Sequence, residues 1–347
     1  MTAGYPLPVL LAVALVALLA AWLLTPLVRR LALALGVVDR PDHRLKTHAR
    51  PMPYLGGLVI LLGVAAGWAV FIGCGAPLPV HDRARSVVIG LGTLLMALLG
   101  LWDDRRNLSP WTKLVWQSLI AGFVAAFGLR MQLVMLPDWL NFILTVVWLV
   151  GMTNAFNLID IMDGLASGVA VIAGLLLYLL AVTTPLYDKT FVAVWSLALA
   201  GAAAGFLRHN YRPAKIYLGD MGALAIGFLL ATLAIGESYT SSTVLGLLAP
   251  LLVLAIPLYD TFYVIVLRLL ARKSILRGSR DHCALRLRRL GLSVEQTVLT
   301  LYAIALLFGL GGLALALSAG VPALLLAGGL VLLALLGGAL LARVTME

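Results

Sequence analysis

Long runs without a charged side chain constrain this chain more than any other feature of its sequence. Residues 6–28 hold none, and apolar runs of similar length recur along the 347 residues. A helix needs about 20 apolar residues to cross a bilayer. The runs are continuous rather than alternating, so an outer-membrane β-barrel does not fit. The sequence therefore predicts an all-α protein that crosses a membrane many times.

Composition narrows the class further. Hydrophobic residues make up 62% of the chain and charged residues 12%, whereas a soluble domain is roughly half apolar and about a quarter charged. A soluble enzyme, a disordered chain and a fibrous repeat are excluded. At roughly 30 residues per span and loop, we predict a polytopic helical bundle of 10–11 transmembrane helices, one catalytic domain over residues 1–347. The predicted spans are 6–28, 54–76, 86–102, 111–129, 139–153, 168–185, 190–207, 221–237, 244–267, 297–318 and 322–342.

The distribution of charge predicts the orientation. All but four of the 25 Lys and Arg residues fall in loops on one side of these spans. The four exceptions are Arg83, Arg85, Arg130 and Lys189. Basic loops stay in the cytoplasm, so we predict an inner (plasma) membrane protein with its N-terminus outside and its C-terminus inside. This explains the net charge of +10 without a nucleic-acid partner.

Acidic residues gather on the same predicted cytoplasmic side, although acids contribute little to orientation. Their clustering indicates chemistry, in loops at about 29–53, 103–113, 154–167, 208–222 and 268–296. Asp103 and Asp104 end one apolar run, and this pair predicts a magnesium or proton-transfer site. The alternative is a plain membrane boundary. Lys113 follows at the next span, where a lone lysine is usually interfacial.

The stretch from Asn154 to Asp163 is more specific. If it is helical, Asn154, Asn157, Asp160 and Asp163 share one face at i, i+3 spacing. Such polar groups on an apolar segment are costly unless they meet a cation, water or a ligand. Two carboxylates one turn apart suit Mg²⁺, which takes one or two carboxylates plus substrate phosphate. A polar seam between helices is the alternative.

A glycine-rich turn opens a later span. In Gly219-Asp220-Met221-Gly222 the glycines allow a tight turn whose free amides could meet an anion. Asp220 would bring a third carboxylate to the metal, and Lys215 a charge for phosphate. A simple N-cap by Asp220 is the alternative.

Two basic loops frame these motifs, the first with Lys46 and His48 and the second with Arg280, His282 and Arg286. Such loops serve as topology signals, but they could also hold an anionic lipid head and a nucleotide diphosphate. Asp260 lies within a span, where an acid marks either a functional site or a polar packing contact.

Together these motifs resemble the polyprenyl-phosphate N-acetylhexosamine-1-phosphate transferase family, from about Arg40 to Ser293. The matching pieces, in the family's order, are His48-x-x-Pro51-x-Pro53-x-x-Gly56-Gly57, Gly100-Leu-Trp-Asp103-Asp104 with Lys113-Leu-x-x-Gln117, Asn154-x-x-Asn157-x-x-Asp160-x-x-Asp163, Asn210-x-x-x-Ala-Lys215-Ile-Tyr-x-Gly-Asp220-x-Gly222 and Pro257-x-x-Asp260. The first piece resembles the branch that primes O-antigen and teichoic acid more than the peptidoglycan branch.

The resemblance implies a bundle of ten or eleven helices, a homodimer, and a reaction that needs Mg²⁺, with Mn²⁺ as the alternative ion. Undecaprenyl phosphate attacks a UDP-N-acetylhexosamine, giving lipid-diphosphate sugar and UMP. By motif match, Asp163 and Asp220 are metal ligands, Asp103 and Asp104 hold or deprotonate the lipid phosphate, and Asp160 is a further catalytic residue. The implied phosphate and nucleotide contacts are Lys113, Asn154, Asn157, Asn210 (at the uracil), Lys215, Arg280, His282 and Arg286, and the implied lipid-phosphate loop carries Lys46 and His48.

Chemistry refines these roles. The second pKa of a phosphate monoester lies near about 6, so the lipid phosphate is largely ionised at neutral pH and needs no strong base. This favours Asp103 and Asp104 as positioning groups, and it leaves a covalent aspartyl intermediate open. A transporter or lipid flippase is the alternative class, although transporters often show two related halves and this sequence shows none.

The sequence departs from the family pattern in the second basic loop. A His-x-His-His cluster is usual there, but only His282 remains, followed by Ala284 and Leu285. Ile161 stands where Gly is usual, and Ala223 where Ser is usual. These changes leave the donor sugar open, with UDP-GlcNAc first, other UDP-N-acetylhexosamines next and UDP-MurNAc-pentapeptide last.

Overall fold

The computed structural model describes residues 7–39, 51–75, 78–127, 129–133, 136–183, 190–235, 248–274 and 279–346. Helices dominate this part of the chain. They are α1 (Leu7–Ala34), α2 (Gly56–Gly73), α3 (Val80–Arg106), α4 (Pro110–Ala126), α5 (Asp138–Ile159), α6 (Leu165–Thr183), α7 (Thr190–Asn210), α8 (Gly219–Ile235), α9 (Leu248–Val253), α10 (Ala255–Leu270), α11 (Cys283–Arg289), α12 (Val294–Ala316) and α13 (Gly320–Ala342). One exception to an all-helical chain is the antiparallel pairing of β1 (Val38–Asp39) with β2 (Met52–Pro53).

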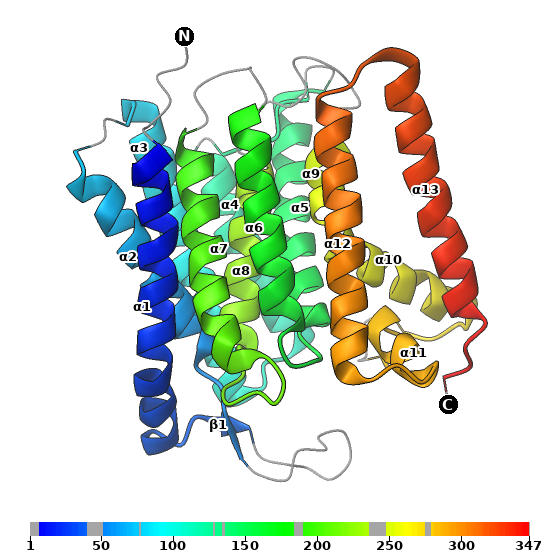
Figure 1. The fold of residues 1–347 in the computed structure, drawn as a ribbon, viewed down its shortest axis with the longest axis horizontal. Helices are drawn as coiled ribbons and strands as arrows, with labels where there is room; N and C mark the ends of the chain where they lie inside the picture. The colour runs from blue at the N-terminus through cyan, green and yellow to red at the C-terminus, as the bar shows by residue number, and fades with distance from the viewer. Residues whose placement is uncertain are drawn as a thin grey trace.

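The long helices stand side by side, with α13 at one edge of the bundle (Figure 1). By length and composition, eight of the described helices could cross a membrane: α1, α2, α3, α5, α6, α7, α12 and α13. This confirms the prediction of an all-α polytopic membrane protein. The larger number of crossings and the orientation stay predictions.

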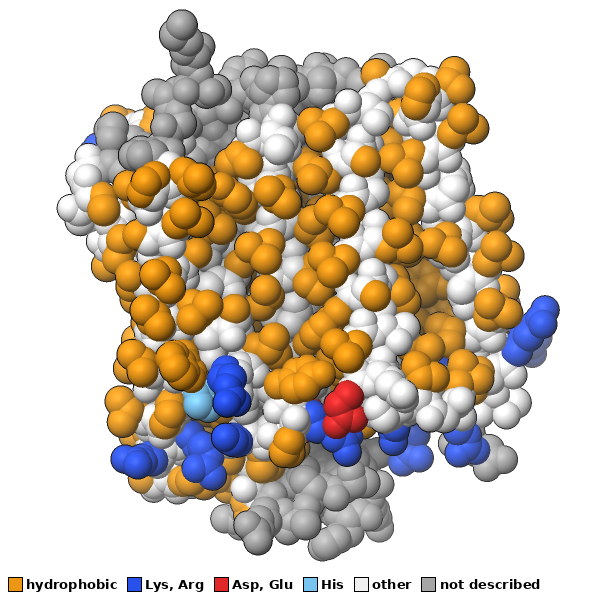
Figure 2. Space-filling model, viewed as in Figure 1, with side chains coloured by type: hydrophobic (Ala, Val, Ile, Leu, Met, Phe, Trp, Pro, Cys, Tyr) orange, Lys and Arg blue, Asp and Glu red, His pale blue; other side chains and the backbone are white. Residues whose placement is uncertain are grey.

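Side chains on the outside of the bundle are mostly hydrophobic, and Lys and Arg gather at its lower end (Figure 2). On α1, Leu11, Leu15, Leu19 and Leu23 are exposed at four-residue spacings, while Ala17 and Ala21 are fully buried. A Cβ added to Gly201 or Gly205 of α7 would collide with backbone of α1. Small residues let α1 and α7 pack closely, which leaves the leucines to face lipid.

The predicted span 244–267 is wrong as one continuous helix. Its described part divides into α9 and α10 on either side of Leu254, and α10 runs across the bundle rather than along it (Figure 1). Pro257 lies in the first turn of α10, where its missing N–H costs no bond within α10 but cannot continue the ladder from α9. The break places Asp260 beneath the bundle's apolar interior.

The central helix positions the site. Every residue of α8 from Met221 to Ile235 is buried, so α8 lies in the core with its first residues at the lower end in Figure 1. We call this the site end, where α3, α5 and α7 finish and α4, α6 and α8 begin. The helix α3 runs past the predicted boundary to Arg106, so Asp103 and Asp104 are held on its last turns rather than on a loop.

Candidate active site

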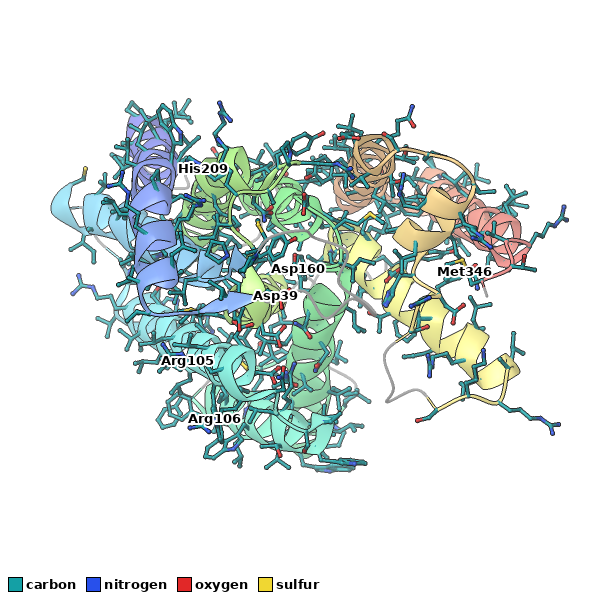
Figure 3. The ribbon with its side chains drawn as sticks, turned by 90° about the horizontal axis from the view of Figure 1, so that it is seen from below. Asp39, Arg105, Arg106, Asp160, His209 and Met346 are labelled. Atoms are coloured by element: carbon teal, nitrogen blue, oxygen red, sulfur yellow. The ribbon has the colours of Figure 1, made fainter. Side chains whose placement is uncertain are left out.

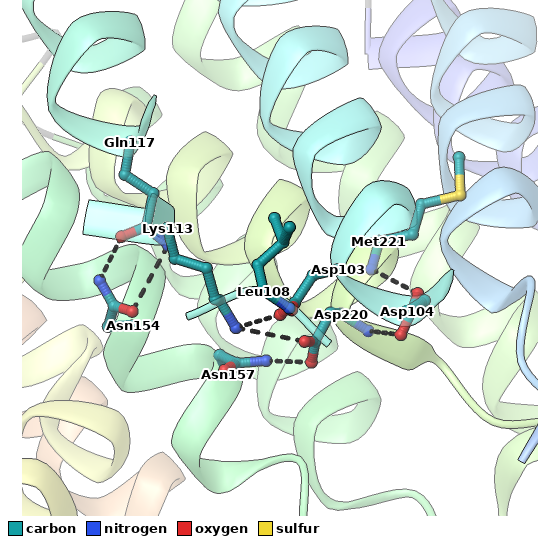
Figure 4. A network of polar contacts seen from close by, with 9 residues as sticks. All are labelled: Asp103, Asp104, Leu108, Lys113, Gln117, Asn154, Asn157, Asp220 and Met221. Carbon is teal, nitrogen blue, oxygen red and sulfur yellow. Dashed lines mark hydrogen bonds and ion pairs between the residues drawn. The ribbon is translucent and has the colours of Figure 1, made fainter. Parts of the chain in front are cut away.

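Asp104 joins α3 to the start of α8. Its Oδ1 accepts a hydrogen bond from the Asp220 backbone N–H at 2.9 Å, and its Oδ2 accepts one from that of Met221 at 3.0 Å (Figure 4). A carboxylate at a helix N-terminus satisfies free amides and meets the positive end of the helix dipole. The cap at this turn is therefore Asp104, from another helix, and these two amides are not left free for an anion.

Asp103 points the other way, toward α4. Its Oδ1 accepts the Leu108 N–H at 2.7 Å, and its Oδ2 lies 2.5 Å from Lys113 Nζ. Ser109 caps α4 by accepting the Thr112 N–H, and Pro110 occupies the first turn, a common pairing at helix starts. The short turn between α3 and α4 thus fixes Lys113 beside Asp103. Both aspartates are engaged by protein groups, which supports positioning roles over that of a base.

Lys113, Asp220 and Asn157 meet at the centre of the cluster (Figure 4). Lys113 Nζ lies 3.2 Å from Asp220 Oδ2, and Asn157 Nδ2 donates to Asp220 Oδ1 at 2.6 Å. Three helices, α4, α5 and α8, supply these groups from positions far apart in sequence. The structure therefore brings together the predicted Asp103, Lys113, Asn157 and Asp220.

Glycines allow the backbone to crowd around Asp220. Gly219 has φ of +74°, which favours glycine. An added Cβ on Gly57 would overlap the backbone of Met221 and Gly222, and one on Gly100 would overlap that of Asp220. The Pro-x-Pro-x-x-Gly-Gly motif thus packs its end against the start of α8.

Backbone hydrogen bonds complete this attachment. Pro53 O accepts the Tyr217 N–H at 2.9 Å, and the N–H groups of Gly56 and Gly57 donate to Tyr217 O and Leu218 O at 3.1 and 3.0 Å. The Tyr54 hydroxyl donates to Asp104 O at 2.6 Å. The described part of the first motif therefore holds the Asp220 turn in place. The predicted Lys46 and His48 lie outside the described residues.

The two asparagines on α5, Asn154 and Asn157, bind different partners. Asn154 exchanges hydrogen bonds with Gln117 of α4, with Nδ2 to Oε1 at 2.7 Å. Gln117 is fully buried and holds the Asn154 side chain by hydrogen bonds, as Asp220 holds that of Asn157. Gln117 belongs to the Lys113-Leu-x-x-Gln117 motif but is not among the predicted site residues. Its i, i+4 spacing from Lys113 is the signal that places both on one face of α4.

Asp160 and Asp163 lie beyond the end of α5. This helix stops at Ile159, and a turn with Gly164 at φ +79° follows. The proposed single face of four polar residues therefore holds for Asn154 and Asn157 only. Asp163 Oδ2 accepts the Ala214 N–H at 3.1 Å, which ties this turn to the segment before α8.

Asp160 lies near the middle of the site end (Figure 3). Burial raises the pKa of Asp160 to about 8, and the charges of Asp220, Asp104 and Asp163 add to this shift. These acids are thus close enough for mutual repulsion, which a cation or a bound proton would relieve.

Asn210 and Lys215 have different surroundings from those predicted. Asn210 is 3% exposed, accepts the Ser167 hydroxyl at 2.7 Å and donates to Ile216 O at 3.0 Å. Both polar atoms of its amide are thus engaged in fixing the segment before α8, and the uracil contact stays a prediction. Lys215 is exposed at the side of the same segment.

His282 forms a buried pair with Asp260. His282 Nδ1 lies 2.6 Å from Asp260 Oδ2, and Asp260 Oδ1 accepts the Cys283 N–H at 2.6 Å. Both side chains are buried, so Asp260 orients the ring at the start of α11. This is the polar packing role that the sequence left open for Asp260. Arg280 is exposed two residues earlier.

Arg286 does not face the acidic cluster, contrary to the predicted diphosphate contact. Its guanidinium pairs with Asp281 Oδ1 at 2.8 Å and donates to Leu341 O and Val344 O at 3.0 and 2.6 Å. Burial works to raise the pKa of Asp281, but hydrogen bonds from Ser279 and Arg286 hold it below its ordinary value. With the ring of Tyr263 at 5.6 Å, Arg286 joins α11 to the end of α13.

Substituting Arg286 with Met is expected to loosen α11. Cys283 is buried on this helix, and Cys74 is the only other cysteine. In a Cys74→Ser background, maleimide should label Cys283 at least about tenfold faster in Arg286→Met, because loss of a buried charge-assisted network costs more than 1.4 kcal/mol. Arg343→Met, at the exposed position directly after α13, should leave the rate unchanged. Equal rates in all three proteins would contradict the proposed attachment.

An apolar cavity of about 450 Å³ lies beside the cluster. Its walls come from the end of α5 and from α6, α10, α11, α12 and α13, and they include Ile159 and Ile161, which flank Asp160. Ala284 forms part of the wall. Where the family usually has a histidine, Ala284 therefore places only a methyl group against the apolar cavity.

The acidic cluster fits Mg²⁺ by its chemistry. Within the described residues, no three His, Cys, Asp or Glu side chains are arranged as a ready-made metal site. Mg²⁺ needs only one or two carboxylates, with water and phosphate completing its shell. Asp163 and Asp220 supply carboxylates near Asp160, whose pKa is raised by burial first and by the charges of these neighbours in addition.

Comparison with known proteins agrees with this geometry. Residues 86–237 match the model described as glycosyl transferase family 4. A probable undecaprenyl-phosphate N-acetylglucosaminyl 1-phosphate transferase of Bacillus subtilis (strain 168) is 35% identical over 306 residues, covering 86% of this chain and 82% of the relative.

Two further relatives show how the likeness extends. The decaprenyl-phosphate N-acetylglucosaminephosphotransferase of Mycolicibacterium smegmatis is 34% identical over 330 residues, covering 86% of this chain and 80% of that one. A phospho-N-acetylmuramoyl-pentapeptide-transferase of Limosilactobacillus reuteri is 35% identical over 163 residues, but covers only 41% of this chain and 48% of its own. The chain is a membrane transferase that belongs to glycosyl transferase family 4.

Proposed function

We propose that this protein transfers N-acetylhexosamine-1-phosphate, with GlcNAc-1-phosphate as the first candidate, from its UDP-sugar to undecaprenyl phosphate. The products are undecaprenyl-diphosphate-sugar and UMP, and the reaction depends on Mg²⁺. The proposed setting is the inner membrane with the site end in the cytoplasm, at the first membrane step of cell-surface glycan synthesis. The names of the full-length relatives support the sugar and the prenyl acceptor.

The observation that carries this proposal is the ammonium of Lys113, held between two carboxylates at the site end. Lys113 touches both Asp103 and Asp220, and Asn157 binds the other oxygen of Asp220. Transfer of a phosphoryl group needs alignment and neutralised charge more than covalent help from the protein. The Lys113 ammonium can turn toward an incoming phosphate while Asp103 and Asp220 keep their positions, because the lysine side chain is a flexible four-carbon stem.

The bond changes are simple. An oxygen of the ionised lipid phosphate bonds to the β-phosphorus of the UDP-sugar, and the bond from that phosphorus to the bridging oxygen breaks, releasing UMP. The second pKa of the lipid phosphate near about 6 removes the need for a base. Asp103 and Asp104 therefore position Lys113 and the start of α8, respectively, while Asp163 and Asp220 would hold Mg²⁺, which supplies charge for the phosphates when bound.

The apolar cavity suits the acceptor's chain. It borders Ile159 and Ile161 on one side and Asp260 on another, so a lipid tail placed there would bring its head toward Asp160. Burying each CH₂ of an isoprenoid stabilises binding by about 0.8 kcal/mol. This placement gives the acceptor a binding surface separate from the polar cluster that takes the donor.

UMP release tests the proposal directly. Purified protein with undecaprenyl phosphate and Mg²⁺ should release UMP with UDP-GlcNAc and more slowly, or not at all, with other UDP-N-acetylhexosamines and UDP-MurNAc-pentapeptide. EDTA should abolish the release. Folded protein that releases no UMP with any donor would overturn the transferase proposal for this chain.

Mg²⁺ and pH should act together on stability. Because the folded-state pKa of Asp160 is about 8 and its ordinary value is about 4, the folded state favours the protonated carboxyl. Metal-free protein should therefore lose stability as pH rises from about 5 to 8, by about 2–6 °C in Tm. Mg²⁺ added at pH 8 should restore it, and Asp160→Asn should lose less stability over the same pH range. A Tm independent of both pH and Mg²⁺ would count against a cation in this cluster.

A further inference from the structure

A basic surface at the site end is not used by the proposed reaction. This basic patch comprises Arg29 and Arg30 at the end of α1, Arg208 and His209 at the end of α7, and the backbone and side chain of Lys215. Figure 2 shows Lys and Arg side chains gathered around a histidine there, directly below a hydrophobic surface. His209 lies toward an edge of the site end, away from the centrally placed Asp160 (Figure 3).

Hydrogen bonds hold the basic patch in one arrangement. His209 Nε2 lies 3.2 Å from Trp22 O, the Lys215 N–H donates to His209 O at 2.8 Å, and Arg29 Nε donates to Lys215 O at 3.0 Å. Two helices and the segment before α8 are thus joined. Among the ion pairs within the described residues, none involves Arg29, Arg30, Arg208 or Lys215.

The basic patch sits at a boundary between apolar and polar surface. Immediately above it on α1, Trp22, Leu23 and Leu27 are 44%, 63% and 56% exposed, as expected for side chains in contact with lipid. Concentrated positive charge beside such a surface attracts anionic lipid headgroups, and basic pockets between transmembrane helices bind them. Guanidinium groups suit phosphate because they donate in a two-point geometry.

We propose that the basic patch binds the phosphate headgroup of an anionic phospholipid, whose acyl chains lie along the exposed leucines of α1. Binding also bears on the site, because Arg29 holds Lys215 O and the same segment gives the Ala214 N–H to Asp163. A lipid that holds Arg29 in place therefore also restricts the motion of residues 211–218, which lead into Asp220. This inference concerns binding and does not depend on the transferase proposal.

Lipid selectivity tests the headgroup site. The protein is placed in nanodiscs that contain both phosphatidylcholine and phosphatidylglycerol and is then released from them. Native mass spectrometry counts the lipids of each kind that stay bound, which gives the preference for phosphatidylglycerol. Arg30→Gln with Arg208→Gln should lower the preference for phosphatidylglycerol by about 30-fold, at about fivefold for each juxtamembrane charge. Arg105→Gln with Arg106→Gln is the matched control, because it removes two adjacent basic residues from the end of α3 at the same site end (Figure 3). It should change the preference by less than about twofold.

Two outcomes would overturn the proposal. If both pairs of substitutions lower the preference equally, only bulk surface charge attracts the lipid, and if neither does, the basic patch is not a lipid site. An excess of inorganic phosphate should not displace the retained phosphatidylglycerol, since the acyl chains contribute to binding.

Hydrogen exchange tests the link to the site. Phosphatidylglycerol should slow amide exchange in residues 211–218 by about threefold or more in the wild type, relative to phosphatidylcholine alone, because one fixed contact that stabilises the segment by about RT has this effect. The Arg30→Gln, Arg208→Gln protein should show no such slowing. Equal exchange in both lipids would contradict the link while leaving the mass-spectrometric result to decide the site.

Discussion

Asp220→Asn is expected to lower UMP release by about 10³-fold or more while the protein stays folded. The substitution keeps the shape of the side chain and removes its charge. Asp220 is where Lys113 and Asn157 converge, so its charge holds both the ammonium and, in the proposed reaction, the cation. Groups that stabilise the charge of reacting phosphates are commonly worth several kcal/mol of transition-state stabilisation. The measurement is kcat/KM for the UDP-sugar at saturating undecaprenyl phosphate.

Two controls make the Asp220→Asn result interpretable. The Tm of the metal-free variant should match the wild type within about 3 °C, because loss of the ion pair with Lys113 is offset by relief of the repulsion between Asp220 and Asp160. Asp138→Asn, on an exposed residue at the start of α5, should leave activity unchanged. Full activity in folded Asp220→Asn would mean that the cluster around Lys113 is not the catalytic centre.

Asp104→Ala is expected to destabilise the protein by about 3 kcal/mol or more. The carboxylate is the acceptor for two backbone N–H groups at the start of α8, and each buried donor left without a partner costs about 1–3 kcal/mol. Loss of the cap also frees the turn that carries Asp220, so UMP release should fall with stability. Thermal unfolding in detergent, followed alongside activity, measures both effects.

The same substitution separates two roles for Asp104. If this carboxylate served only as a base, Asp104→Ala would abolish activity and leave the Tm unchanged. Asp138→Ala provides the comparison, because it removes an acid from the first turn of α5 that makes no side-chain cap there, and should cost less than about 1 kcal/mol.

Local sequence patterns predicted the class of fold and most members of the cluster. Apolar length identifies spans without any knowledge of their partners, and acids at span ends are costly enough to indicate a site. The same patterns could not assign partners. Asp104 and Asp220 lie 116 residues apart in sequence, so which of them caps α8 depends on how α3 packs against α8.

Arg286 and the divided span show the same limit. A basic loop in a sequence suggests side chains that are free to bind a ligand. Arg286 instead donates to backbone carbonyls 55 and 58 residues later. The hydropathy of residues 244–267 reflects how apolar they are but not the direction in which a helix runs. The turn at Leu254 changes only the direction of the chain. Such features follow from tertiary contacts that a single sequence does not report.

The glycines packed around the start of α8 are needed for folding, whereas Lys113 and Asp220 are needed for the proposed reaction. Two genetic selections should therefore distinguish these two groups of residues. In a library of single substitutions sorted only for folded protein in the membrane, side chains larger than hydrogen should be depleted at Gly57 and Gly100, where a Cβ meets backbone. Substitutions at Lys113 and Asp220 should survive that sort and disappear only when growth depends on the product. The difference between the two surveys would outline the reaction centre residue by residue, from genetics alone.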